Sequence, residues 1–223
     1  MIIIKNLEKK FNNESFIKFK DYTFEDGKTY VITGPSGCGK STLLNLISGI
    51  ISPTNGEVIV TIDDETYHIE KMSQKKKDDF RFSNVGYVFQ DFKLVEEFSV
   101  IDNMRMLNIN GKSFSDSEIK NALSLTHIGN KMKQKVKSLS GGEKQRVAIS
   151  RAIIKKSNIV LADEPTESLN ETLSHEIIEL LTSVAKKEQK TLIMVTHDNS
   201  LVKYFDVHVD VSDFLKKEGG INV

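Results

Sequence analysis

Residues 34–41 combine glycines with a lysine and a hydroxyl in a pattern suited to binding phosphate. The run is Gly34-Pro35-Ser36-Gly37-Cys38-Gly39-Lys40-Ser41, which follows an apolar strand and leads through Thr42 into a helical segment. It matches G-x-x-x-x-G-K-[ST], in which backbone N–H groups and the positive end of the helix surround an anion. Lys40 would reach the β- and γ-phosphates, and Ser41 would ligate Mg²⁺. The pattern predicts a nucleotide site; a glycine-rich turn without a ligand is the alternative.

Two carboxylates follow a second apolar strand. Residues 158–162 end at Asp163-Glu164, so both side chains emerge where a parallel sheet presents its ligand site. We expect Asp163 to belong to the Mg²⁺ shell and Glu164 to orient or deprotonate the water that attacks the γ-phosphate. A structural pair that caps the helix after Pro165 is the alternative.

Gln90 and His197 each end a predicted strand, where a polar side chain could reach the γ-phosphate. Taken alone, neither residue is specific evidence for a nucleotide site. A glutamine at a strand end more often anchors a loop, and a histidine more often has a structural role. Four other histidines lie outside any motif, and we expect them to be structural or exposed: His68, His127, His175 and His208.

These residues need an α/β scaffold to bring them together. Short β-branched runs alternate with segments of helical spacing, which favours a parallel sheet flanked by helices. The expected strands are 2–4, 29–33, 57–62, 85–89, 158–162, 191–196 and 207–211. The expected helices are 40–48, 74–81, 100–107, 115–126, 142–155, 173–187 and 199–204.

Turn signals at 12–13, 26–27 and 55–56, with hairpin-like alternation around 58–69, predict a small antiparallel sheet beside the parallel one. The run Lys75-Lys76-Lys77 beside Asp78-Asp79 is interpreted as a solvated helix face.

The length and composition of the chain limit the classes of function that it can have. The 223 residues suit one domain, and the charged residues balance, 31 basic against 31 acidic, so nucleic acid is not an expected partner. No apolar run approaches the length of a membrane span, and the charged N-terminus does not resemble a secretory signal. Cys38 is the single cysteine, which agrees with a reducing compartment. We therefore expect a cytoplasmic protein.

A second glycine turn opens a predicted helix at residues 139–146. The run is Leu139-Ser140-Gly141-Gly142-Glu143-Lys144-Gln145-Arg146. This run resembles the signature sequence of ABC-transporter ATPases, and with the motifs above the resemblance covers essentially the whole chain. It implies a P-loop NTPase (RecA-like) core with a small antiparallel β subdomain. A helical signature subdomain at about 91–150 would be inserted in one ABC ATPase domain, 1–223.

The resemblance also implies roles. Two identical subunits would bury two ATP molecules head to tail, so that Ser140, Gly141 and Gly142 act on the partner's nucleotide. Gln90 would contribute to the metal shell and link it to a membrane partner, and His197 would be the switch histidine. An aromatic near the N-terminus would stack on adenine; Phe11 is the first candidate, with Tyr22 and Phe16 as alternatives.

One residue departs from the family pattern: Asn170 stands where the loop after the acidic strand usually ends in Asp. Asn keeps the shape and an acceptor but loses the charge, so coupling between the two sites could change. Glu143 replaces the commoner Gln, as it does in many members of the subgroup that the chain most resembles.

That subgroup serves macrolide efflux, lipoprotein release, cell division and antimicrobial-peptide transport in bacteria, and runs 88–94, 139–146 and 162–166 look most like it. The resemblance implies an ATPase that powers a separate permease by dimer closure, peripheral on the inner face of the cell membrane. We expect the permease to contact residues 91–107 through apolar side chains, which could instead fill a core: Phe92, Leu94, Val95, Phe98 and Met104. A soluble ABC ATPase without a transport role, or a nucleotide sensor without catalysis, are the alternatives.

Overall fold

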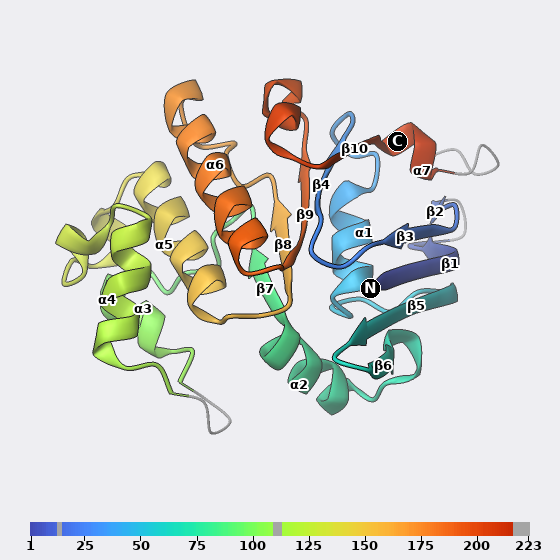
Figure 1. The fold of residues 1–223 in the computed structure, drawn as a ribbon, viewed down its shortest axis with the longest axis horizontal. Helices are drawn as coiled ribbons and strands as arrows, with labels where there is room; N and C mark the ends of the chain where they lie inside the picture. The colour runs from blue at the N-terminus through green and yellow to red at the C-terminus, as the bar shows by residue number, and fades with distance from the viewer. Residues whose placement is uncertain (13–14, 109–112, 216–223) are drawn as a thin grey trace.

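The computed structural model describes residues 1–12, 15–108 and 113–215 of the chain. Within them, a five-stranded parallel sheet runs in the order β10-β4-β9-β8-β7 (Figure 1). Its strands are Val207–Asp210, Thr29–Thr33, Thr191–Thr196, Ile159–Asp163 and Val85–Val88. All residues of β4, β8 and β9 are buried, which explains their continuous apolar character. The predicted α/β fold is confirmed.

A second, antiparallel sheet contains β1 Ile2–Lys10, β2 Phe16–Lys18, β3 Tyr22–Phe24, β5 Asn55–Ile62 and β6 Glu65–His68. Helix α1, Lys40–Ile47, lies between the two sheets (Figure 1). Its Leu43, Leu44 and Ile47 share one core cluster with the antiparallel sheet and with one face of the parallel sheet. The helix that starts at the glycine loop is therefore fixed by packing on both sides.

The other face of the parallel sheet is covered by α5, Gly141–Ile154, and α6, Glu171–Lys187 (Figure 1). Ile149 of α5 and Ile177 of α6 pack there with Val88 and Met194 of the sheet. The remaining elements outside the helical segment are η1 Ile69–Lys71, α2 Gln74–Asn84, η4 Asn199–Tyr204 and α7 Val211–Phe214.

A helical segment lies at the end of the molecule away from the antiparallel sheet (Figure 1). It contains α3 Val100–Arg105, α4 Asp116–Leu125, η2 Gly129–Lys131 and η3 Val136–Ser138. Its core also takes Val147 and Ile154 from α5, so α5 belongs to both this core and that of the parallel sheet. Met104 is fully buried in the helical core, which makes its expected place on a partner surface wrong. Among the described residues, no helix is long and apolar enough to cross a membrane.

Lys77 contradicts the expected solvated face of α2. Lys75 and Lys76 are exposed, but Lys77 is 4% exposed and its Nζ donates to Ser52 Oγ at 2.6 Å. The interpretation is wrong at Lys77 because its aliphatic stem packs close to Gly49 while the ammonium reaches the loop before β5.

The expected turn at Asn55-Gly56 is also wrong, because both residues lie within β5. A Cβ at Gly56 would come within 2.3 Å of the Asn6 carbonyl oxygen, and the pairing of β1 with β5 shifts register between Lys5 and Glu8. The absence of a side chain at Gly56 thus makes room for the register shift between β1 and β5. The β5–β6 hairpin turns instead at 63–64, where both residues have positive φ. Asn13 of the expected turn at 12–13 lies outside the described residues.

Candidate functional site

The glycine loop joins the end of β4 to the start of α1. Gly39 is the N-cap of α1 with φ 97°, and a Cβ at this position would lie 2.6 Å from Ile17 Cδ1. Glycine is therefore required here by both conformation and space. No side chain caps α1, and its first turn contains no acidic residue. The start of α1 thus presents backbone N–H groups and the positive end of the helix dipole to an anion.

Lys40 is held at the base of this loop. Its Nζ donates to the carbonyl oxygens of Gly34 at 2.8 Å and Pro35 at 3.0 Å, and it lies 3.6 Å from Glu164 Oε1. The side chain is buried. A buried ammonium beside a helix N-terminus provides a strong local positive field for phosphate oxygens.

Asp163, at the end of β8, accepts a 2.8 Å hydrogen bond from Ser41 Oγ. Burial raises the pKa of Asp163, and the charges of Glu164 and Glu167 add to this rise, while the Ser41 hydrogen bond and Lys40 oppose it. A hydroxyl and a carboxylate in contact form a hard oxygen donor pair. Such donors fit Mg²⁺, which takes one or two carboxylates and completes its shell with phosphate oxygens and water.

Glu164 contacts His197 across the ends of two adjacent strands. Glu164 Oε2 lies 3.1 Å from His197 Nδ1 and accepts a 3.3 Å hydrogen bond from the His197 backbone N–H. Glu164 is largely buried and His197 is exposed. A carboxylate placed in this way can accept a proton from a water on its solvent side, while the imidazole fixes its orientation.

Gln90 follows β7 and contacts a residue that the sequence analysis did not select. Its Nε2 donates to Glu167 Oε2 at 2.6 Å. Glu167 lies in the loop between β8 and α6, between the predicted base Glu164 and Asn170. The pairing of β7 with β8 brings the two loops together, and this information is not present in either local sequence.

A cavity of about 260 Å³ brings most of the expected site residues together. Those that line it are Phe11, Ser36, Gly37, Gly39, Lys40, Ser41, Thr42, Gln90, Glu164 and His197. Ser15, Ile17 and Glu167 also line it and were not expected. Gly34, Pro35 and Cys38 lie in the same loop without lining the cavity, and Asp163 reaches it through Ser41.

Of the aromatic candidates, Phe11 lines the cavity, and the residue is 53% exposed. Tyr22 instead packs on Phe24 and Phe214, with ring centroids 4.9 and 4.5 Å apart. Phe16 lies under the Lys18 ammonium. The geometry therefore favours Phe11 as the ring available to a base.

Ser140, Gly141 and Gly142 do not line this cavity. Ser140 is the N-cap of α5, and Glu143 completes a capping box in which Glu143 Oε2 accepts from the Ser140 N–H at 2.9 Å. Lys131 also pairs with Glu143, and these two contacts lower the pKa of the Glu143 carboxyl. Ser140 and Gly141 are exposed beside the loop that contains Ser168 and Leu169. This helix N-terminus is thus presented outward, away from the chain's own glycine loop cavity.

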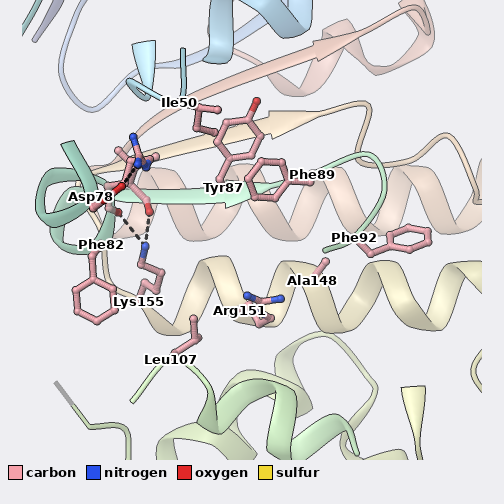
Figure 2. A pocket seen from close by; sticks show the side chains of 12 residues that line it. Ile50, Asp78, Phe82, Tyr87, Phe89, Phe92, Leu107, Ala148, Arg151 and Lys155 are labelled. Atoms are coloured by element: carbon pink, nitrogen blue, oxygen red, sulfur yellow. Dashed lines mark hydrogen bonds and ion pairs between the residues drawn. The ribbon is translucent and has the colours of Figure 1, made fainter. Parts of the chain in front are cut away.

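A second cavity, of about 320 Å³, lies between β7, α2 and α5 (Figure 2). Tyr87 and Phe89 stack in it with ring centroids 4.0 Å apart, and the Tyr87 hydroxyl donates to Asn45 Oδ1 at 3.0 Å. Burial raises the pKa of Tyr87, with a smaller contribution from Asp163. Phe92 and Leu107 also line the cavity.

Arg151 of α5 lies across this cavity from the aromatic pair (Figure 2). One of its terminal nitrogens donates to the Lys93 carbonyl at 2.6 Å, and its Nε is buried without a hydrogen-bond partner among the described residues. Burial lowers the pKa of this guanidinium. The cavity thus combines apolar and aromatic side chains with the charged groups of Asp78, Arg81, Arg151 and Lys155. Of these, Arg151 has a buried nitrogen whose hydrogen-bonding capacity is not used among the described residues.

Comparison with known proteins places the chain among transport ATPases. A family model described as ABC transporter matches residues 18–167. The lipoprotein-releasing system ATP-binding protein LolD of Treponema denticola is 36% identical over 215 residues, which are 93% of each chain. The putative hemin import ATP-binding protein HrtA of Staphylococcus epidermidis is 34% identical over 223 residues, 95% of this chain and 96% of the relative.

Two solved structures of the cassette MJ0796 are similar over nearly the whole chain. Its dimeric structure has a TM-score of 0.84 and 30% identity and covers 94% of each chain. A dimeric post-hydrolysis state bound to ADP and Pi has a TM-score of 0.84 and 29% identity and covers 99% of this chain and 100% of that one.

Proposed function

The chain belongs to the ABC transporter family as an ATP-binding subunit with ATPase activity, and we propose that its ATPase centre is the cavity between the glycine loop and the ends of β7, β8 and β9. The observation that carries this proposal is the convergence of Lys40, Ser41, Gln90, Glu164 and His197 on that cavity. These residues come from separate segments of the chain, and together they provide the groups that phosphoryl transfer to water needs.

Residues 34–42 bind the phosphates of ATP, with Lys40 exchanging its loop carbonyl contacts for phosphate oxygens. Ser41, Asp163 and the amide oxygen of Gln90 hold Mg²⁺. When bound, this ion neutralises charge on the β- and γ-phosphates. Phe11 stacks on the adenine at the mouth of the cavity, where its exposed ring is accessible to a base.

Hydrolysis follows from the position of Glu164. Its carboxylate orients a water toward the γ-phosphorus and accepts a proton as the oxygen–phosphorus bond forms. The bond between the γ-phosphorus and the bridging oxygen breaks, and ADP leaves with that oxygen. His197 holds the carboxylate through the 3.1 Å contact. Lys40 stabilises the charge that develops on the transferred phosphoryl group.

The second half of the site comes from another copy of the chain. Ser140 and Gly141 are exposed at the start of α5 and lie outside the cavity of their own chain. A head-to-tail homodimer would place Ser140, Gly141 and Gly142 on the γ-phosphate bound by the partner, where the N-terminus of α5 attracts negative charge. Each ATP is then buried between two subunits, so its binding energy favours dimer closure.

The dimer drives a separate membrane subunit, which docks in the cavity of Figure 2. Relatives named for lipoprotein release and hemin import act as ATP-binding proteins of such systems. The cavity fits a short helical segment with apolar side chains and a carboxylate, because Tyr87, Phe89 and Leu107 line it together with Arg151, whose Nε has no hydrogen-bond partner among the described residues. Phe98 and Val95, both exposed, extend this surface within residues 91–107.

In this proposal, the protein lies on the inner face of a bacterial cell membrane, where it is bound to its permease. The cargo belongs to the range that the resemblance suggests: a lipid, lipoprotein, peptide or drug that is exported or moved mechanically.

The decisive variant is Glu164→Gln, measured for phosphate release and, by light scattering, for dimer formation with Mg²⁺ and ATP. We expect turnover to fall by at least about 100-fold, because a general base contributes on that order, while ATP binding remains and dimers accumulate. Glu179→Gln, which neutralises an exposed carboxylate of α6, is the matched control and should behave as the wild type. Turnover of Glu164→Gln at the wild-type rate would exclude Glu164 as the base.

A further inference from the structure

Gln90 and Glu167 join two loops that both border the ATP cavity. We propose that this pair is a latch: Glu167 holds the Gln90 amide away from the nucleotide's metal, so that binding of Mg²⁺ and ATP must break the contact. The inference rests on the proposed function of the cavity and adds a regulatory step to it.

The geometry of the contact supports a latch. Gln90 Nε2 and Glu167 Oε2 are 2.6 Å apart, and both side chains line the cavity that contains Lys40 and Ser41. An amide that donates to a carboxylate makes a charge-assisted hydrogen bond, which is stronger than one between neutral groups. The loops that bear the two residues follow β7 and β8, which pair in parallel, so a short side-chain contact spans them.

The Glu167 carboxylate has no cationic partner among the described residues. Burial is the main cause of the raised pKa of nearby Asp163, and the charges of Glu164 and Glu167 add to it. An exposed glutamate in such surroundings would ordinarily turn toward water to reduce repulsion. Its position over the cavity is therefore explained by the hydrogen bond from Gln90.

The loop that the latch holds contains a strained stretch of backbone. Phe92 and Lys93 both have positive φ, at 62° and 48°, and neither is glycine. Consecutive residues in this region of conformational space persist only when surrounding contacts hold them. One contact is the Glu167 hydrogen bond at Gln90, and another is the bond from Arg151 to the Lys93 carbonyl at 2.6 Å.

The contacts at Gln90 and Lys93 hold the two ends of residues 90–93, which connect the ATP cavity to the cavity of Figure 2. Gln90 faces the first cavity, and Phe92 lines the second. When the Gln90 amide turns toward the nucleotide, its bond to Glu167 is lost and one restraint on Phe92 is removed. Through the latch, binding of ATP with Mg²⁺ thus changes the restraint on Phe92 in the docking surface.

A double-mutant cycle tests the latch. The affinity of a fluorescent ATP analogue with Mg²⁺ is measured by titration for the wild type, Glu167→Ala, Gln90→Ala and the double variant. We expect Glu167→Ala alone to tighten binding by about three- to tenfold, because a molecule held mostly in a form that cannot bind shows a proportionally weaker apparent affinity. In the Gln90→Ala background, Glu167→Ala should leave the affinity unchanged.

Two further variants sharpen the result. Glu167→Gln keeps an acceptor for the Gln90 amide without the charge, so its affinity should lie between those of the wild type and Glu167→Ala. Glu179→Ala removes an exposed carboxylate elsewhere on the chain and should leave binding unchanged.

Equal tightening by Glu167→Ala in both backgrounds would overturn the latch, because it would show only the removal of a negative charge. No tightening in either background would also overturn it. If the wild type fails to bind the analogue, the proposed function fails and the latch with it, whereas binding without coupling between the two residues overturns the latch alone.

Discussion

Glu164 Oε2 lies 3.1 Å from His197 Nδ1, across the ends of the neighbouring strands β8 and β9. Backbone hydrogen bonds of both residues hold this contact in place. Glu164 has φ 45°, its N–H donates to the Val195 carbonyl at 3.1 Å, and its carboxylate accepts from the His197 N–H. The sheet therefore sets the position of the proposed base before any ligand is bound.

His197→Ala should reduce turnover while leaving ATP affinity near that of the wild type. The imidazole orients Glu164, so its loss should slow the chemical step by about 100-fold, at the lower end of the effect of general-base catalysis. Steady-state phosphate release and nucleotide titration measure the two quantities. His127→Ala removes an exposed imidazole outside the cavity and serves as the control. A large loss of ATP affinity in His197→Ala would show a binding role instead.

Asn170→Ala should lower the free energy of unfolding by about 1 kcal/mol, since Asn170 Oδ1 caps α6 by accepting from the Leu173 N–H at 2.9 Å. For a chain of this size, that corresponds to a fall in Tm of about 2–4 °C. Asn170→Asp keeps the cap and should leave Tm unchanged in thermal denaturation. An altered turnover in Asn170→Asp would then report the added negative charge rather than a change in stability. Equal Tm values for wild type and Asn170→Ala would contradict the capping role.

Lys77→Ala should destabilise the fold by about 1–3 kcal/mol, because it removes a buried stem and leaves Ser52 Oγ without the Lys77 donor. Lys76→Ala changes an exposed neighbour of the same type and should alter stability by less than about 0.5 kcal/mol. Chemical denaturation of both variants gives the comparison. If the two variants are equally stable, Lys77 is solvated in solution.

Glu143→Gln should change the pH dependence of stability. Its contacts with Lys131 and the Ser140 N–H lower the Glu143 pKa below the usual 4.5. A lowered pKa in the folded state means that this carboxylate stabilises the fold above its unfolded pKa, and that the contribution disappears as pH falls through its folded pKa. Gln retains the capping box.

The wild type should thus exceed Glu143→Gln in stability at pH 7 by less than about 1 kcal/mol, since the pair is partly exposed. The difference should shrink below about pH 4.5, toward zero. Urea denaturation of both proteins from pH 7 to pH 3 provides the measurement. A difference that grows as the solution becomes more acidic would have the opposite sign and would contradict the assignment.

Local patterns were sufficient for the strands and helices that bear the site. Thr29–Thr33 and Thr191–Thr196 have the predicted bounds because a buried parallel strand is a continuous apolar run with sharp polar ends. The glycine loop was predicted from its residue spacing and from the strand and helix that flank it, which are all local in sequence. Strand β1, by contrast, extends to Lys10, well beyond the expected Ile4, because pairing with β2 and β5 orders residues that look polar.

The incorrect or missing predictions for Lys77 and Glu167 arise from contacts between segments that are distant in the sequence. Charge alone predicted a solvated Lys77, but the loop around Ser52 provides an acceptor that no local pattern shows. Glu167 was overlooked because its partner Gln90 is remote in sequence and becomes adjacent only through strand pairing. Met104 is different: it follows Val100 at helical spacing, and this periodicity favoured burial over exposure.

The central claim is that each ATP lies between the glycine loop of one subunit and residues 140–142 of another. Cys38 lies in that loop as the single cysteine, so Ser140→Cys in a Glu164→Gln background introduces one further thiol at the opposite surface. A short bismaleimide should cross-link this variant to a dimer only with Mg²⁺ and ATP, and should fail when Cys38→Ser is added or when Ser140 is retained. Cross-linking that needs only one type of thiol, or that is independent of ATP, would contradict the head-to-tail site.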